Sequence, residues 1–206
     1  MMTATPPMTV LALGCGRKQA VSDYFGPQFS AREITLLTLD ANPGVAPQMV
    51  CRLGVDPIPL PDDSVSLIIA NHLLEHIGQQ GDTTQWFQFW EEAYRVLRPA
   101  GGLQFECPYY SSMWAWADPT HVRAISEMTF LYFNQEAYRA KDSAIPRFRI
   151  RADFAFAPHP NTGQANWETF PDWGNPDVMA KEPVSHIRGM LAARKPFKGW
   201  WEDGDV

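Results

Sequence analysis

The sequence has few cysteines, no long apolar run and no run of like charge, and each absence excludes a class of protein. Its 206 residues include three cysteines, and none of them forms a C-x-x-C pair. An odd number of isolated cysteines is typical of reduced thiols rather than of a disulfide framework. The first residues, MMTATPPMTVLALGCG, lack a charged segment and carry only a short apolar run, so we expect neither a signal peptide nor a membrane span. These absences predict a soluble, cytoplasmic protein.

Charge is sparse and slightly acidic. Lysine and arginine number 17 against 23 aspartates and glutamates, which gives a formal net charge of −6, and no five like charges follow one another. Because a basic face is the usual mark of a protein that binds duplex nucleic acid, we expect no such partner. Hydrophobic residues make up 45% of the chain, enough for the core of a single domain over residues 1–206.

Apolar segments in the first half predict the strands of a parallel sheet. The run SLIIA is continuous and rich in β-branched residues, as in strands buried on both faces. The predicted strands are residues 9–13, a segment from residue 33 that ends at Asp40, QMVCRLG, residues 65–70 and residues 103–107. A helix lies between the last two, with apolar residues at helical spacing from Trp86 to Leu97, a cap at Asp82 or Thr83, and a stop at Pro99. This alternation predicts a doubly wound α/β fold.

The second half gives weaker signals. The segments RFRIRADFAF and SHIRGMLAARKP predict a sixth and a seventh strand. Between them, PHPNTGQANWETFPDWGNPD is rich in proline, glycine, asparagine and aspartate, which predicts a long loop at about 157–180. The final FKGWWEDGDV carries two tryptophans, which we expect to pack back onto the domain; contact within a homodimer is the alternative.

A glycine turn and an acid predict a nucleoside site. The sequence LGCG follows the first strand directly, and Gly14 and Gly16 would let the backbone approach a ligand closely. Asp40 ends the second strand, where an acid that holds ribose hydroxyls is expected. Gln19 stands where a dinucleotide motif has its third glycine, so we expect a ligand with a ribose and no pyrophosphate. The alternative interpretation is a tight turn beside a solvated aspartate.

Four segments in this order resemble class I S-adenosylmethionine-dependent methyltransferases of the small Rossmann-like type: VLALGCG, LTLDANP, PLPDDSVSLIIANHLLEHI and EEAYRVLRPAGGLQFECP. The resemblance covers about residues 9–135, with a weaker match at IRGMLAARKP. It implies a mostly parallel seven-stranded sheet flanked by helices, with an antiparallel seventh strand inserted beside the sixth. It also implies S-adenosylmethionine as cofactor and methyl transfer to an oxygen or nitrogen nucleophile.

The resemblance further implies a set of cofactor-binding residues. The glycine turn would lie against the amino-acid part, the acid of the second strand would hold the ribose, and the backbone after the third strand would lie near the adenine. The residues after the fourth strand would lie near the sulfonium. The implied set is Leu13, Gly14, Cys15, Gly16, Asp40, Ala41, Leu53, Gly54, Asn71 and His72.

Three positions depart from the family pattern. Ala12 stands where many members have an acid, Lys18 where many have a third glycine, and Arg52 where many have an aspartate. These departures keep open a second function class, a non-catalytic methyltransferase-like domain that binds a nucleoside or a protein partner. A third, an aminopropyl-transferring enzyme, would need an acidic pocket that the sequence does not show.

The segment ADPTHVR concentrates titratable groups after the fifth strand, on the side where parallel strands gather ligands. We predict a substrate-side segment at about 108–145, with a small-molecule or saccharide-like substrate. In the functional interpretation His121 is a general base or an orienting group, and Arg123 binds an anionic substrate group or Asp118. In the alternative, the three form a cluster that fastens a loop.

Two histidines, His72 and His76, lie four residues apart in the segment NHLLEHI. On a helix they would share one face. A metal site needs more ligands than two, and the sequence does not identify a convergent third. We therefore predict no metal site.

Overall fold

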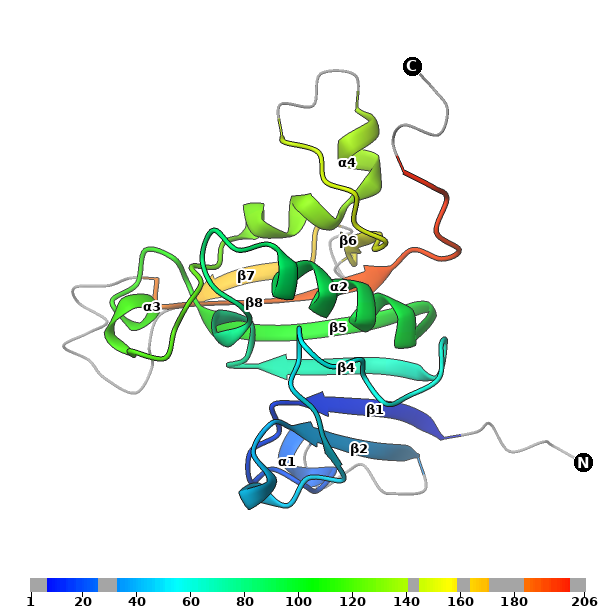
Figure 1. Ribbon diagram of the computed structural model, residues 1–206, viewed down its shortest axis with the longest axis vertical. Helices are drawn as coiled ribbons and strands as arrows, with labels where there is room; N and C mark the ends of the chain where they lie inside the picture. The colour runs from blue at the N-terminus through cyan, green and yellow to red at the C-terminus, as the bar shows by residue number, and fades with distance from the viewer. Residues whose placement is uncertain (1–6, 26–32, 141–144, 159–163, 171–183, 201–206) are drawn as a thin grey trace, which may run out of the picture.

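The computed structural model describes residues 7–25, 33–140, 145–158, 164–170 and 184–200. These residues form one eight-stranded sheet, in which seven strands follow the order β3-β2-β1-β4-β5-β8-β6 and β7 also pairs with β8 (Figure 1). The strands in that order are β3 (Met49–Val50), β2 (Ile34–Asp40), β1 (Met8–Leu13), β4 (Val65–Asn71), β5 (Leu97–Pro108), β8 (His186–Ala193) and β6 (Phe154–Phe156), with β7 at Trp167–Phe170.

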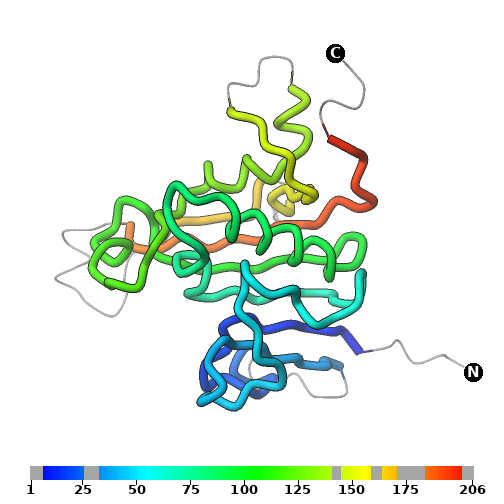
Figure 2. Tube along the Cα trace, viewed as in Figure 1, coloured from blue at the N-terminus to red at the C-terminus, as the bar shows by residue number. Residues whose placement is uncertain are grey.

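The doubly wound sheet expected from the sequence is confirmed. Strands β1 to β5 pair in parallel, and β8 runs antiparallel between β5 and β6, as the resemblance implied for the seventh strand. Figure 2 shows the orange β8 beside the green β5. A strand from the last part of the chain is therefore an inner strand of the sheet. A run of four buried residues ends β1, as expected of a strand covered on both faces.

Two sequence predictions need correction. The segment expected as a long loop at 157–180 contains β7, because the β-favouring residues Trp167–Phe170 find a free edge of β8; residues 159–163 and 171–183 lie outside the described residues. The predicted helix also ends one residue earlier than expected, since Leu97 already belongs to β5. Leu97 is extended and pairs with Val65 of β4, so strand pairing begins directly after the helix.

The helices are few and mostly short. The longest, α2 (Thr84–Val96), lies over the face of the sheet in front of β5 (Figure 1), and the carboxylate of Asp82 accepts a hydrogen bond from the Thr84 amide at its start. No helix among the described residues is both long and apolar enough to cross a membrane. The other helical segments are α1 (Ser22–Phe25), η1 (Pro43–Val45), η2 (Leu74–His76), α3 (Trp114–Ala117), η3 (Glu127–Phe133) and α4 (Gln135–Arg139).

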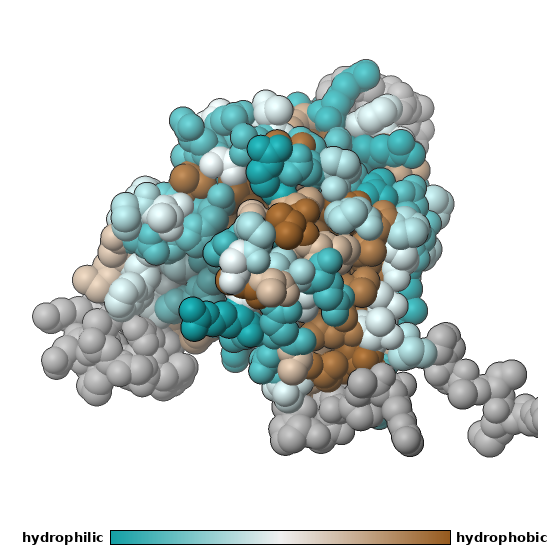
Figure 3. Space-filling model, turned by 60° about the horizontal axis from the view of Figure 1, so that its bottom comes forward, coloured by the Kyte–Doolittle hydropathy of each residue, from teal (hydrophilic) through white to brown (hydrophobic). Residues whose placement is uncertain are grey.

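An aromatic core lies between α2 and the sheet. Trp90 is fully buried and stacks on Phe133 of η3, with ring centroids 4.4 Å apart, and its edge meets Phe154 of β6 at 5.4 Å. A smaller cluster around Val10 and Ile69 occupies the opposite face of the sheet. Viewed from the β2 edge, apolar side chains gather in a band among hydrophilic ones (Figure 3). The aromatic core attaches the segment after β5 to α2, because Phe133 of η3 stacks on Trp90 of α2.

Truncation of Trp90 tests this aromatic core. We expect Trp90→Ala to lower the free energy of unfolding by about 3–5 kcal/mol, because it removes a buried indole and leaves a cavity. Urea unfolding measures the change. Trp116→Ala is the matched control, since that indole is 69% exposed and its loss should cost far less. Equal destabilisation by both substitutions would contradict the assigned core.

Candidate functional site

The carboxyl ends of β1, β2, β4 and β5 lie along one edge of the sheet, where open α/β sheets bind ligands. A cavity of about 430 Å³ opens there. Two other cavities, of about 470 and 770 Å³, lie around Lys195 and Arg194 at the opposite edge, where the parallel strands begin. We place the functional site at the carboxyl edge because the sequence-predicted residues gather there.

The structure brings the glycine turn and Asp40 together. Gly14 and Gly16 follow β1 with φ of +59° and +53°, a backbone conformation that other residues rarely adopt. The Gly16 amide donates a hydrogen bond of 2.9 Å to the Asp40 carboxylate, and the Cys15 amide donates one of 3.2 Å to the Leu39 carbonyl. The first two strands thus present a turn and an acid as one unit.

This unit fits the ribose of a nucleoside. A Cβ placed on Gly16 would meet nothing within 4 Å, so space is open in front of the turn. The two oxygens of Asp40 accept one hydrogen bond each, from the amides of Gly16 and Asn42. Each carboxylate oxygen has a further acceptor site, which suits the two hydroxyls of a ribose. Gln19, in place of a third glycine, donates to the Val45 carbonyl and closes the turn.

The remaining predicted cofactor residues lie at the same edge or beside it. Ala41 is exposed directly after Asp40, and Leu53 is half-buried. Gly54 is buried with φ of +78°, and a Cβ there would lie 2.6 Å from the Gln85 carbonyl oxygen, so this glycine allows close contact with α2. Asn71 ends β4, and its buried Oδ1 accepts no hydrogen bond from the described residues. A ligand donor would satisfy that acceptor.

His72 stands between two acids. Its φ is +50°, its Nδ1 lies 3.6 Å from a Glu75 carboxylate oxygen, and its Nε2 lies 3.7 Å from one of Glu106. The neighbouring Glu75 carboxylate raises the pKa of His72. The imidazole meets that of His186 edge to face, with ring centroids 5.6 Å apart. Both imidazoles line the cavity.

The predicted segment 117–123 forms the other wall of the cavity. Asp118 accepts hydrogen bonds from the amide and hydroxyl of Thr120, which hold the pKa of its carboxyl below the usual range. Nε2 of His121 lies 3.8 Å from the Asp118 carboxylate, and the imidazole is only 9% exposed. The cavity is lined by His72, Pro108, Trp114, Ala117, Asp118, Pro119, His121 and His186.

Arg123 does not line the cavity. Its guanidinium donates hydrogen bonds to the carbonyls of Ile77, Gln79 and Asp82, and it lies over the Trp86 ring at 4.3 Å from the centroid. Burial lowers its pKa. These contacts favour the alternative in which the arginine fastens a loop, and its predicted role as an anion binder stays a prediction.

Comparison with known proteins supports the fold. A family model described as a methyltransferase domain matches residues 11–105. The chain has the fold of S-adenosylmethionine-dependent methyltransferases. One such enzyme from Mesorhizobium loti is 14% identical with a TM-score of 0.55, over 91% of this chain and 91% of that chain. Another, from Archaeoglobus fulgidus, is 15% identical with a TM-score of 0.53, over 91% and 86%.

The fold also occurs in a protein of another activity. The cyclase SpnF is 14% identical to this chain with a TM-score of 0.56, over 94% of this chain and 77% of that chain. A comparison with curated protein sequences found no match. At these identities the likeness establishes the fold, and the activity must be argued from the site.

Sequence reasoning missed three side chains of this site. Glu75 belongs to the family-like LLEHI segment, but the sequence indicated for it only a role in local structure. Glu106 and His186 reach the site through strand pairing, since His186 lies opposite Pro108 in the antiparallel β5–β8 pair. No spacing along the chain announces such a neighbour, because the two strands are nearly 80 residues apart.

Substitution of Arg123 separates its two interpretations. We expect Arg123→Ala to lower the free energy of unfolding by about 2–4 kcal/mol, because three carbonyls and an aromatic ring lose a charged partner. Arg123→Lys should recover little of this, since one ammonium cannot reproduce the planar fork. Thermal and urea unfolding measure both. Unchanged stability would contradict the fastening role and restore the anion-binding interpretation.

Proposed function

We propose that this chain is an S-adenosylmethionine-dependent methyltransferase that acts on an oxygen or nitrogen nucleophile of a small molecule. The observation that carries the proposal is the hydrogen-bonded unit of Gly16 and Asp40 at the carboxyl edge, on the same edge as a largely apolar cavity that three imidazoles and one carboxylate also line. The family model over residues 11–105 supports it.

The cofactor half of the site is formed by the strand ends. The backbone of residues 13–16 would hold the amino-acid part, and Asp40 with Ala41 the ribose. Leu53 and Gly54 would flank the adenine, and Asn71 and His72 would face the reacting end. Bound there, the cofactor supplies an electrophilic methyl group on a sulfonium.

The substrate half is the cavity between segment 117–123 and His186. His121 and Asp118 would orient the nucleophile, since the imidazole faces a carboxylate that its Thr120 hydrogen bonds keep ionised. Trp114, 39% exposed, forms an apolar part of the wall that suits a planar or saccharide-like substrate. Holding a nucleophile in line with a donor supplies most of the catalysis expected of such a site.

A non-catalytic nucleoside-binding or protein-binding domain is the second candidate, favoured by the three departures from the family pattern. In the structure Ala12 is buried in β1, Lys18 is exposed, and Arg52 donates two hydrogen bonds to the Asp56 carboxylate. Arg52 thus has a structural partner within its own turn. None of these contacts fills the space in front of Gly16.

Binding of S-adenosylhomocysteine tests the cofactor half. At 100 times its dissociation constant the ligand should stabilise the chain by about 2.7 kcal/mol. This corresponds to a rise in melting temperature of roughly 5–10 °C for a chain of this size. Adenosine diphosphate is the control, since the turn lacks the third glycine of a pyrophosphate site. No shift with millimolar S-adenosylhomocysteine would overturn the proposed function.

Asp40→Ala tests the ribose contact. Loss of a charged acceptor for two hydroxyls should weaken S-adenosylhomocysteine binding by roughly 10- to 100-fold, as measured by calorimetry. Asp62→Ala is the matched control, because that exposed carboxylate pairs with Arg95 at the opposite edge of the sheet. Unchanged affinity in Asp40→Ala would remove this acid from the site.

A further inference from the structure

A buried carboxylate without a hydrogen bond lies beside two imidazoles at the carboxyl edge. Glu75 is 1% exposed, and neither of its carboxylate oxygens accepts a hydrogen bond from the described residues. Nδ1 of the His72 imidazole, which is cationic only when protonated, lies 3.6 Å from one of these oxygens. A buried carboxylate is costly unless a cation or hydrogen-bond donors compensate it. A bound cation would therefore stabilise the ionised form of this carboxylate.

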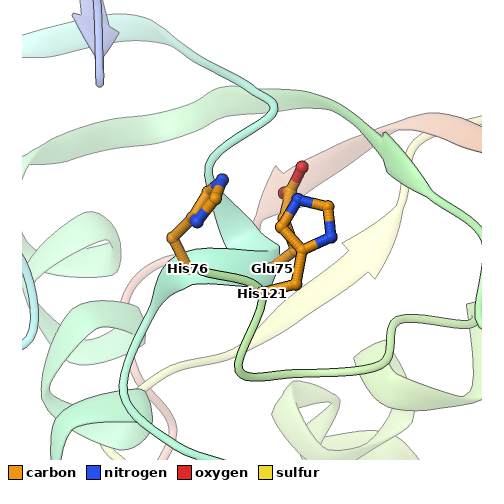
Figure 4. A group of neighbouring side chains, drawn as sticks. All are labelled: Glu75, His76 and His121. Carbon is orange, nitrogen blue, oxygen red and sulfur yellow. The ribbon is translucent and has the colours of Figure 1, made fainter. Parts of the chain in front are cut away.

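Two histidines converge on this carboxylate from different segments. Glu75 and His76 belong to η2, whereas His121 comes from the loop that passes beside it (Figure 4). One ligand atom of each residue lies within 4.8 Å of the other two. The Val122 amide donates a hydrogen bond of 2.8 Å to the Glu75 carbonyl, which ties the two segments together. Of the two histidines considered from the sequence, only His76 belongs to this cluster, and His72 does not.

In each imidazole of the cluster, one ring nitrogen faces an oxygen atom of the protein and the other is available to bind a metal ion. Nδ1 of His76 lies 3.1 Å from the Thr120 carbonyl oxygen, so Nδ1–H donates there and Nε2 keeps its lone pair. Nε2 of His121 faces the Asp118 carboxylate, and its buried Nδ1 has no hydrogen-bond partner among the described residues. Metal-binding histidines commonly have their second nitrogen held by a carbonyl or a carboxylate in this way.

We propose that Glu75, His76 and His121 bind a divalent first-row transition metal ion of the Zn²⁺ class. Two imidazoles and one carboxylate form a donor set typical of such ions. Tetrahedral ligands about 2.1 Å from zinc lie about 3.4 Å apart, so the side chains must close by roughly 1 Å. The exposed His76 can rotate to do so. Three protein ligands leave a fourth position open.

The proposed ion would hold the cavity wall in place. His121 lines the cavity, and Glu75 lies beside His72, which lines the same cavity. A bound ion would join η2 to segment 118–123 and neutralise the carboxylate. This inference does not rest on the proposed methyltransferase activity, because it requires only these three side chains.

Titration of the chelator-treated full chain with ZnCl₂ tests the proposal. We expect one ion per chain by calorimetry, and Co²⁺ should give the visible absorption of a nitrogen and oxygen site. Glu75→Gln, His76→Gln and His121→Gln should each weaken Zn²⁺ binding by at least about 100-fold. His186→Gln is the matched control, since it removes a cavity imidazole outside the cluster and should bind as the unsubstituted chain does.

Three outcomes would overturn the proposal. They are no Zn²⁺ binding by the unsubstituted chain, equal binding by His76→Gln, and a thiolate-to-cobalt absorption band that would assign the ion to cysteines. His76→Gln carries the decision if the buried variants do not fold, because an exposed substitution should change the melting temperature of the metal-free chain by only about 1–2 °C. S-adenosylhomocysteine titrated into the metal-free chain tests the proposed function separately, so failure of one leaves the other standing.

Discussion

The parallel pairing of β1 with β2 and with β4 is the constraint on which the site depends. Because these strands run in one direction, their last residues meet at one edge of the sheet. The glycine turn and Asp40 lie at that edge as strand ends, 24 residues apart in sequence and joined by one hydrogen bond. Apolar side chains buried on both faces set this register, and the polar residues of the site follow from it.

A second constraint fixes the substrate side. The segment after β5 contributes few backbone hydrogen bonds to the sheet and is held instead by aromatic packing of η3 against α2. Arg123 adds a polar attachment, because it donates to carbonyls of the chain between η2 and α2. These two attachments hold the C-terminal end of segment 117–123, whose residues Asp118 and His121 line the cavity. Aromatic packing therefore positions this loop, in which the Asp118 side chain stays exposed and that of His121 is largely buried.

The sequence predicted the elements whose signal is local. Continuous apolar runs identified strands β1 to β5, and helical spacing identified α2. A strand buried on both faces is apolar throughout, whereas a helix buried along one stripe has apolar residues every three or four positions. β7 was missed since four residues in a polar, proline-rich stretch carry little periodicity and pair only because β8 offers an edge. His186 was missed for a related reason: its place beside His72 follows from the antiparallel register of β8 opposite Pro108. The glycine turn with Asp40 was found because its residues are tied to strand ends.

The cluster of Glu75, His76 and His121 changes what the imidazole of His121 can do. An imidazole that binds a metal through Nδ1 keeps its proton on Nε2, so it can donate a hydrogen bond but cannot accept a proton from a nucleophile. In this geometry Nε2 faces Asp118 and the cavity, which suits an orienting group that fixes a substrate acceptor atom. The general-base interpretation of His121 and the metal site therefore exclude each other. Zn²⁺ binding by the unsubstituted chain would decide between them in favour of the orienting role.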